Sequence, residues 1–371
     1  MRSAAVGVHV AAVVSLVACS GSSGRPLPPT DTPAAPPVVT VVPNVAAGPT
    51  YDVHEWGLLR GTPDDHVMLS GPRAEPAPMV MAKPVLYFHR HGEGALVVDV
   101  EARMIGGRIV EHWPSFGGVP GERATWADVV IQPGSCRGSR YPTLAEEPCS
   151  RLTDGCEAAT LATVETTDSD CVHWPRPPGG GGPTQAWNHL FYRGETAAAP
   201  SLPLHLSPLP DGTLRVTAAG DRRIPGRLVR LRRSNGVVGV TDAAEVVAPP
   251  APGGTVVIAS PTGSLSAARA SLASSLREAG LTQPETEAFR RSWDDALFGP
   301  TVTASARLET LRTETTPVAT ARPMAPPRAT TSLLYVLPQE SAEALATLTF
   351  TPPPRSVRRA IVVWIDETAA R

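Results

Sequence analysis

Regular alternation in the segment 95–105 is the feature that most constrains the fold. Apolar side chains recur at every second position, at Leu96, Val98, Val100, Ala102 and Met104. Since charged side chains fill most positions between them, this period of two predicts a half-buried strand of an antiparallel sheet. Strands are also predicted at 84–91 and 108–113, and the short glycine connections at 92–94 and 106–107 are typical of hairpins.

Strand patterns return later in the chain. They occur at 213–218, 227–231, 237–240, 255–260, 332–338, 346–352 and 358–366. The sequence Ser234-Asn235-Gly236 predicts a tight turn that joins the second and third of these segments.

Two helices are predicted within 264–298. The first carries an apolar stripe through Leu265, Ala268, Leu272 and Leu276. The second begins at Thr282, which forms a capping box with Glu285, and it carries Phe289 and Trp293 on one face. The order of strands, helical hairpin and strands predicts an α+β fold that is mainly β, with antiparallel β-sandwich-like lobes and an inserted helical hairpin.

The N-terminus has the features of an export signal. Arg2 gives it a positive start, and the apolar stretch that follows is too short to be a stop-transfer helix. It ends in Leu16-Val17-Ala18-Cys19, which resembles the lipobox of bacterial lipoproteins, where the cysteine is lipidated and becomes the first residue. The alternative is a plain signal peptide cleaved nearby, with Cys19 unmodified. Ser20, which follows the cysteine, favours the outer membrane. We therefore expect an exported protein that is anchored to the cell envelope by its lipid.

Composition separates this signal from the folded body. Residues 20–50 contain much proline, little charge and no aromatic residue, which predicts an extended tether. The predicted domains are a signal peptide at 1–18 and a lipidated cysteine with its tether at 19–50, followed by the body. A body of about 320 residues is large for one core, so we expect two lobes. These are an N-terminal β-rich lobe with a disulfide loop at 51–175, and a C-terminal β-rich lobe at 184–371 that contains the hairpin 264–298.

Four further cysteines lie in one stretch, at Cys136, Cys149, Cys156 and Cys171. An even number in an exported chain predicts two disulfides. A zinc site is the alternative, although the closely spaced cysteine pairs of such sites are missing. Sequential pairing (136 with 149, 156 with 171) and nested pairing (136 with 171, 149 with 156) are equally compatible with the sequence.

Charge and missing motifs exclude several function classes. The leader contains one of the 33 basic residues, and the rest nearly balance the 35 acidic ones, so no nucleic-acid partner is implied. Lys83 is the only lysine, and its sequence context matches no Walker A loop, Ser-x-x-Lys nucleophile or Schiff-base motif. The motifs G-x-S-x-G and H-E-x-x-H are also missing.

A polar face is predicted if the first two hairpins form. Phe88 would then pair with Val98, and Glu101 would face His112. The face would display Tyr87, His89, Asp99, Glu101 and His112, with His91 at its edge. Two or three such groups could hold zinc or another divalent ion, or serve as acid and base at a glycan. The alternative, which sheet faces generally favour, is a solvated surface with Glu101 and His112 as an ordinary cross-strand pair.

The stretch YDVHEWGLLRG at 51–61 joins a histidine, a glutamate and a tryptophan. In a strand His54 and Trp56 point to one side and Glu55 to the other, so His54 and Glu55 cannot reach one ligand without a bulge. We therefore expect the first strand of a fold here, with Trp56 as a core anchor and Arg193 as the partner of Glu55. For Tyr192 we expect packing, with ligand stacking as the alternative.

These motifs together resemble a family of uncharacterised exported bacterial proteins. The shared features are HEWG at 54–57, KPVLYF at 83–88, LFYRG at 190–194, a tryptophan-bearing helix and LLYVLP at 333–338, in this order. The chain departs from the family in GLLR at 57–60, where GTFT is usual, and in the His89-Arg90-His91 end of its LYF strand. The resemblance implies fold and location, and it marks His54, Glu55, Trp56, Tyr192 and Arg193 as motif residues. It implies no activity.

Two functional hypotheses follow. The first is a non-enzymatic lipoprotein, held at the lipid bilayer by Cys19, whose body binds an envelope protein or a glycan. The second is a metal- or carboxylate-dependent hydrolase acting on envelope or extracellular glycan, which depends on the predicted polar face. No cofactor is expected under the first hypothesis, and a divalent metal ion is the only one expected under the second.

Overall fold

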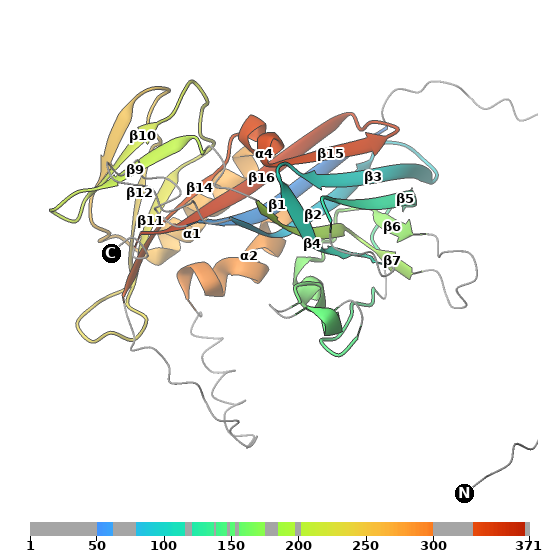
Figure 1. Cartoon of the computed structure of the whole chain (residues 1–371), viewed down its shortest axis with the longest axis horizontal. Helices are drawn as coiled ribbons and strands as arrows, with labels where there is room; N and C mark the ends of the chain where they lie inside the picture. The colour runs from blue at the N-terminus through green and yellow to red at the C-terminus, as the bar shows by residue number, and fades with distance from the viewer. Residues whose placement is uncertain are drawn as a thin grey trace, which may run out of the picture. The chain divides into compact units, whose positions relative to one another are not determined.

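The computed structural model describes residues 50–61, 79–115, 121–136, 139–146, 149–152, 156–174, 185–196, 202–299 and 329–367. The predicted signal, Cys19 and the tether up to residue 49 lie outside these residues. The described part is mainly β, with several antiparallel sheets and a helical hairpin, as predicted (Figure 1).

A large sheet forms the middle layer of the fold. Its central strands, β1 and β16, run parallel, and every other neighbouring pair is antiparallel. The strands in spatial order are β12 (Ala243–Val247), β11 (Leu228–Arg233), β14 (Thr330–Val336), β16 (Ser356–Asp366), β1 (Tyr51–Gly61), β2 (Val80–Arg90), β8 (Leu190–Thr196) and β4 (Gly107–Trp113). The two predicted lobes therefore share one sheet, and the strands are not divided at residues 175–184.

Two smaller sheets complete the β structure. The five-stranded sheet has the order β15 (Ala346–Thr351), β3 (Leu96–Met104), β5 (Arg123–Gln132), β6 (Cys171–Trp174) and β7 (Gln185–Trp187). The three-stranded sheet has the order β13 (Thr255–Ile258), β10 (Leu214–Ala218) and β9 (Leu204–Pro208).

Both faces of the large sheet are buried. One face shares a hydrophobic core with the two smaller sheets, which makes a sandwich. The other, which we call the helical face, packs against α1 (Leu265–Glu278), α2 (Gln283–Phe298) and the 3-10 helix η3 (Ala158–Val164) (Figure 1). Two short helices, η2 (Cys149–Arg151) and α4 (Gln339–Leu345), lie in connections. Because side chains on both faces of the large sheet are buried, its strands, such as 360–363 in β16, read as continuous apolar runs.

The helices begin where the capping residues predict. The hydroxyl of Ser264 accepts the amide hydrogen of Ala267 at the start of α1. At α2, the hydroxyl of Thr282 accepts from the amide of Glu285, and the Glu285 carboxylate accepts from the amide of Thr282. This reciprocal pair is the predicted capping box.

The two hairpins predicted before residue 113 do not form. Strand β2 lies between β1 and β8, so Phe88 pairs with Val53 and not with Val98. Strand β3 lies between β15 and β5, and His112 pairs with Tyr192 and not with Glu101. The glycine connections instead carry the chain from one sheet to another. The segment predicted as a strand at 237–240 is a turn, and β11 pairs with β12 beyond it.

The disulfides have the nested pairing. Cys136 is bonded to Cys171, and Cys149 is bonded to Cys156. Two disulfides indicate an oxidising compartment outside the cytoplasm. No helix in the described residues is long and apolar enough to cross a membrane.

Candidate functional site

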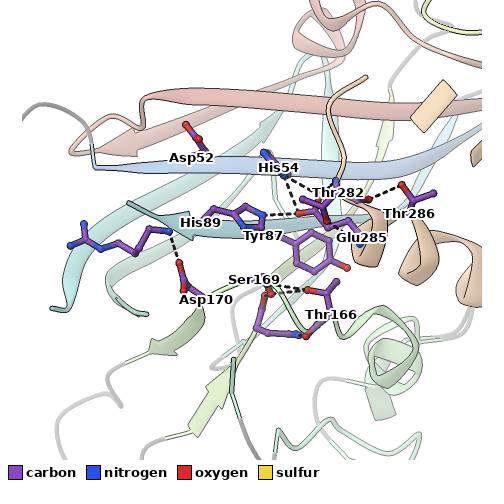
Figure 2. Close-up of polar contacts among 12 residues, drawn as sticks. Asp52, His54, Tyr87, His89, Thr166, Ser169, Asp170, Thr282, Glu285 and Thr286 are labelled. Atoms are coloured by element: carbon purple, nitrogen blue, oxygen red, sulfur yellow. Dashed lines mark hydrogen bonds and ion pairs between the residues drawn. The ribbon is translucent and has the colours of Figure 1, made fainter. Parts of the chain in front are cut away.

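Three side chains from distant parts of the chain meet on the helical face. They are His54 on β1, His89 on β2 and Glu285 in the first turn of α2. Their ligand atoms all lie within 4.8 Å of one another. We call this cluster the His–His–Glu site, and Figure 2 shows both rings turned toward the Glu285 carboxylate.

Strand register brings the two histidines together. His54 pairs with Tyr87, so His89, two residues further along β2, is its diagonal neighbour on the same face of the sheet. The two imidazole ring centroids are 4.4 Å apart. Both side chains are largely buried, with 14% and 15% of their surface exposed.

The docking of α2 brings the carboxylate to the histidines. Glu285, Phe289 and Trp293 are spaced four residues apart and form one stripe of the helix. The ring of Phe289 packs edge-on against Trp56 at 5.4 Å, two residues along β1 from His54. The stripe therefore follows β1, and Glu285 lies over His54 with its side chain completely buried.

The carboxylate of Glu285 accepts hydrogen bonds on both oxygens. The Nε2 atom of His89 lies 2.8 Å from Oε1, and the Nδ1 atom of His54 lies 3.0 Å from Oε2 and 3.1 Å from Oε1. The amide of Thr282 also donates to Oε2 at 2.8 Å. The capping box thus fixes the rotamer of Glu285, and this fixes where its carboxylate meets the rings.

These contacts favour the charged forms of the site. Burial alone would raise the pKa of Glu285, but the hydrogen bonds from His54 and His89 lower it to about 2. Burial opposes a charge on His89, but the hydrogen bond to Glu285 and its negative charge raise the pKa of His89 above its usual value. The carboxylate is therefore ionised at neutral pH, as a metal ligand must be, whereas a protonated His89 has to release its proton before its nitrogen can bind an ion.

The donor set is one that zinc and similar divalent ions use. Two imidazole nitrogens and one carboxylate form three ligands, and an open fourth position is typical of catalytic zinc sites. Ligands about 2.1 Å from a tetrahedral ion lie roughly 3.4 Å from each other. The nitrogen-to-oxygen distances at Glu285 fall only a few tenths of an ångström short of this, so small side-chain rotations would admit an ion.

The polar face predicted from the hairpins is not present. Of its members, only Tyr87 and His89 lie on the helical face of the large sheet. Asp99 and Glu101 lie on β3 in the five-stranded sheet, with Asp99 exposed and Glu101 paired to Arg123 at 3.5 Å. The prediction is wrong because it took neighbours in sequence as neighbours in the sheet.

The remaining histidines of that prediction have other partners. His112 packs edge-on against Trp126 at 5.7 Å, and burial lowers the pKa of His112 to about 4. His91, expected at the edge of the polar face, lies 2.7 Å from an oxygen of Asp52. Neither of them belongs to the His–His–Glu site.

The motif residues divide between the two faces of the sheet, as their alternation predicts. Trp56 is fully buried in the core on the helical face, which confirms its predicted role. Glu55 is buried on the opposite side, where it pairs with Arg359 and accepts a hydrogen bond from the hydroxyl of Tyr192 at 2.6 Å. Its predicted partner was wrong, because Arg193 lies 3.1 Å from Glu111 instead.

The sequence predicts Glu285 only as a capping residue, and no motif marks Arg359. The signal for Glu285 was its position on the apolar stripe of α2, where a carboxylate must have buried partners. Comparison with protein-family models and with curated proteins finds no match to this chain.

Proposed function

We propose that the protein is a lipid-anchored protein of the bacterial cell envelope whose body binds a divalent metal ion at the His–His–Glu site. The convergence of His54, His89 and Glu285 supports the metal. The leader that ends at Cys19, and the oxidising compartment that the disulfides indicate, support the location.

The metal would have a structural consequence as well. The site joins β1 and β2 to the start of α2, so a bound ion would cross-link the helical hairpin to the large sheet. Ions that bind only the folded state stabilise it. Such a body is suited to present a fixed surface to an envelope protein or a glycan, which is the partner class we propose. The resemblance to the HEWG family of exported proteins agrees with this assignment.

We expect protein purified without a histidine tag and dialysed against zinc to retain about one equivalent of metal. Replacing His89 by alanine should reduce this to less than about a tenth of an equivalent, because only two ligands would remain. The variant Glu285→Gln should have a similar effect, since glutamine keeps a carbonyl for the capping box but loses the negative charge. Elemental analysis measures the stoichiometry.

His205→Ala is the matched control, because His205 is exposed on β9 and lies outside the site. Its zinc content should equal that of the wild type. The metal assignment fails if wild-type protein retains no zinc, or if His205→Ala and His89→Ala lose it equally.

A metal-dependent hydrolase is the second candidate, and one observation favours it. Three protein ligands leave a coordination position open, and both histidines keep some solvent exposure. A zinc ion there would lower the pKa of a bound water and supply a nucleophile for esters or glycans. Turnover of a glycan or ester library by zinc-loaded protein, together with no partner recovered from cross-linked envelopes, would favour this candidate over binding alone.

Lipidation at Cys19 is the best-supported part of the proposed location. A diacylated and N-acylated cysteine buries several chains at about 0.8 kcal/mol per methylene, whereas a single chain gives only marginal anchoring. We propose the outer membrane as the site of anchoring because Ser20 follows the cysteine.

The full-length protein should therefore partition into the detergent phase, and Cys19→Ser should release it or leave it unprocessed. Detergent phase separation and mass spectrometry of the N-terminus measure both outcomes. Wild-type protein in the aqueous phase with an unmodified N-terminus would refute lipidation and leave the metal site untouched.

A further inference from the structure

Lys83 occupies an unusual position in the backbone of the large sheet. Trp56 pairs with Val85 and Leu58 pairs with Ala82, so Lys83 and the proline after it form a β-bulge in β2. The φ angle of Lys83 is +46°, in the left-handed region of backbone conformation that residues other than glycine and asparagine rarely adopt. A following proline further restricts this residue. Strained positions that the fold maintains are concentrated at functional sites.

The side chain of Lys83 is buried without a direct ionic partner. Only 8% of the residue is exposed. Its Nζ atom lies 5.4 Å from the ring centroid of Trp293, and within the described part of the chain this amine makes no hydrogen bond or ion pair. Burial lowers the pKa of Lys83, against the attraction of Glu157 and Glu111. A larger fraction of the amine is therefore neutral, and so nucleophilic, than in a lysine exposed to water.

Two carboxyl groups act electrostatically on the amine, the partly buried Glu157 and the buried Glu111. Glu157 accepts the backbone amide of Lys83 at 2.8 Å, and Glu111 accepts the backbone amides of Ala158 and Glu157 at 2.7 and 3.2 Å. Burial raises the pKa of both carboxyl groups, against the attraction of Lys83 and Arg193. Carboxyl groups whose pKa is raised by burial are candidates for proton transfer.

A purely structural role explains this arrangement less well. A lysine that served only as a counter-ion would place its ammonium against a carboxylate. The chain uses arginine for every other basic side chain, and arginine remains charged when buried, whereas lysine does not. The only lysine of the chain thus lies at a buried position where its amine can lose a proton, which an arginine there could not do.

Arg60 indicates which ligands could approach the amine. Its guanidinium lies 5.6 Å from the centroid of the same Trp293 ring and 4.6 Å from that of Trp364, and the residue is exposed. The amine of Lys83 and the guanidinium of the exposed Arg60 therefore lie at similar distances from the same ring. A small molecule that carries a carboxylate could pair with Arg60 while its other end reached Lys83.

We propose that Lys83 is a reactive amine that forms an imine with a small carbonyl compound bearing a carboxylate, of the 2-oxo acid class. The neutral Nζ attacks the carbonyl carbon and forms a carbon–nitrogen bond, while the carbonyl oxygen takes up a proton. The carbon–oxygen bond of the carbinolamine then breaks as this oxygen takes up a second proton and leaves as water. Over the two steps the nitrogen gives up both of its protons, which leaves the imine. We assign the delivery and recovery of these protons to Glu157, whose carboxylate accepts the backbone amide of Lys83. The sequence context gave no sign of this chemistry, which arises from the bulge and from η3.

This site is separate from the metal site. Glu285 and Trp293 are eight residues apart on α2, which is about 12 Å of helix rise. The inference does not depend on metal binding.

The test uses full-length protein with glyoxylate as the probe and cyanoborohydride to trap the imine. Since the chain contains one lysine, peptide mapping separates its adduct from any adduct of the N-terminal amine. At pH 7 we expect Lys83 to react at least about tenfold faster than a blocked free lysine, because burial lowers its pKa and leaves more of the amine neutral. Glu157→Gln should slow the reaction, and Lys83→Arg should abolish the adduct.

A second comparison tests the ligand class. Arg60→Ala should slow the reaction with glyoxylate but not with acetaldehyde, which lacks a carboxylate. Equal slowing with both would overturn the assignment of a 2-oxo acid. A Lys83 that reacts no faster than the free lysine, or only after denaturation, would overturn the proposal as a whole, and this measurement needs no variant.

Discussion

Replacing Glu55 by glutamine should destabilise the protein by about 3–5 kcal/mol, because it leaves the guanidinium of Arg359 as an uncompensated charge in the core. Glu55 is fully buried and Arg359 nearly so. The carboxylate of Glu55 also accepts the hydroxyl of Tyr192, while Arg359 donates to the backbone carbonyl of Ala342 at 3.0 Å. Urea denaturation under non-reducing conditions measures the free energy of unfolding.

An exposed ion pair provides the matched control. Glu195 lies 2.8 Å from Arg108 on the surface, and Glu195→Gln should cost less than about 1 kcal/mol. The double variant Glu55→Gln with Arg359→Met should recover part of the loss, since the unpaired charge is gone while Ala342 still lacks its donor. Equal costs for Glu55→Gln and Glu195→Gln would contradict the expectation.

Lowering the pH from 7 to 4 should destabilise the fold by several kcal/mol, mainly through His189. This histidine is completely buried, and burial lowers its pKa to about 3. Its Nδ1 atom lies 2.8 Å from the side-chain oxygen of Asn188, while its Nε2 atom has no partner among the described residues. The rings of Tyr87 and Tyr141 cover it. Protonation would thus place an unpartnered cationic N–H in the core.

The direction of the effect follows from the two states. The unfolded chain binds the proton near pH 6.5, and the folded protein binds it only near pH 3, so stability is complete above pH 6.5 and falls as the pH drops. At about 1.4 kcal/mol per unit, His189 alone contributes a loss of roughly 3 kcal/mol at pH 4. His112, with a pKa of about 4, adds to it.

Denaturation at pH 7, 5.5 and 4 measures this dependence. His112→Phe should flatten it in part, because phenylalanine keeps the edge-on contact with Trp126 without a titratable nitrogen. A free energy of unfolding that does not change between pH 7 and 4 would show that these rings take up protons as readily in the folded protein as in the unfolded chain, which would contradict the expectation.

The sequence predicted the elements of the fold better than their partners. The strand at 95–105 and the capping box at Thr282 depend on neighbouring residues, and both are confirmed. The partners of β2 depend instead on which segments of the whole chain bury its two apolar faces. A strand buried on both faces carries no alternation from which its register could be inferred.

The His–His–Glu site shows the same limit. His54 and His89 were each identified, one from a motif and one from a predicted face, but nothing local joined them. Their meeting depends on the β1–β2 register, and Glu285 reaches them only because α2 packs along β1 through Phe289. A site formed by tertiary packing is visible in the sequence only as single residues.

The parallel pairing of β1 with β16 has a consequence for how this protein matures. Strand β1, at residues 51–61, cannot complete its pairing at the centre of the large sheet until β16, at residues 356–366, is present. Contacts between residues so distant along the chain form slowly. Since the chain is synthesised from its N-terminus, one edge of β1 stays unpaired until β16 has been made. A ribosome stalled before residue 356, or a protease that removed residues 356–366, would leave a chain that has all the other strands but lacks β16. The large sheet would then be divided between β14 and β1.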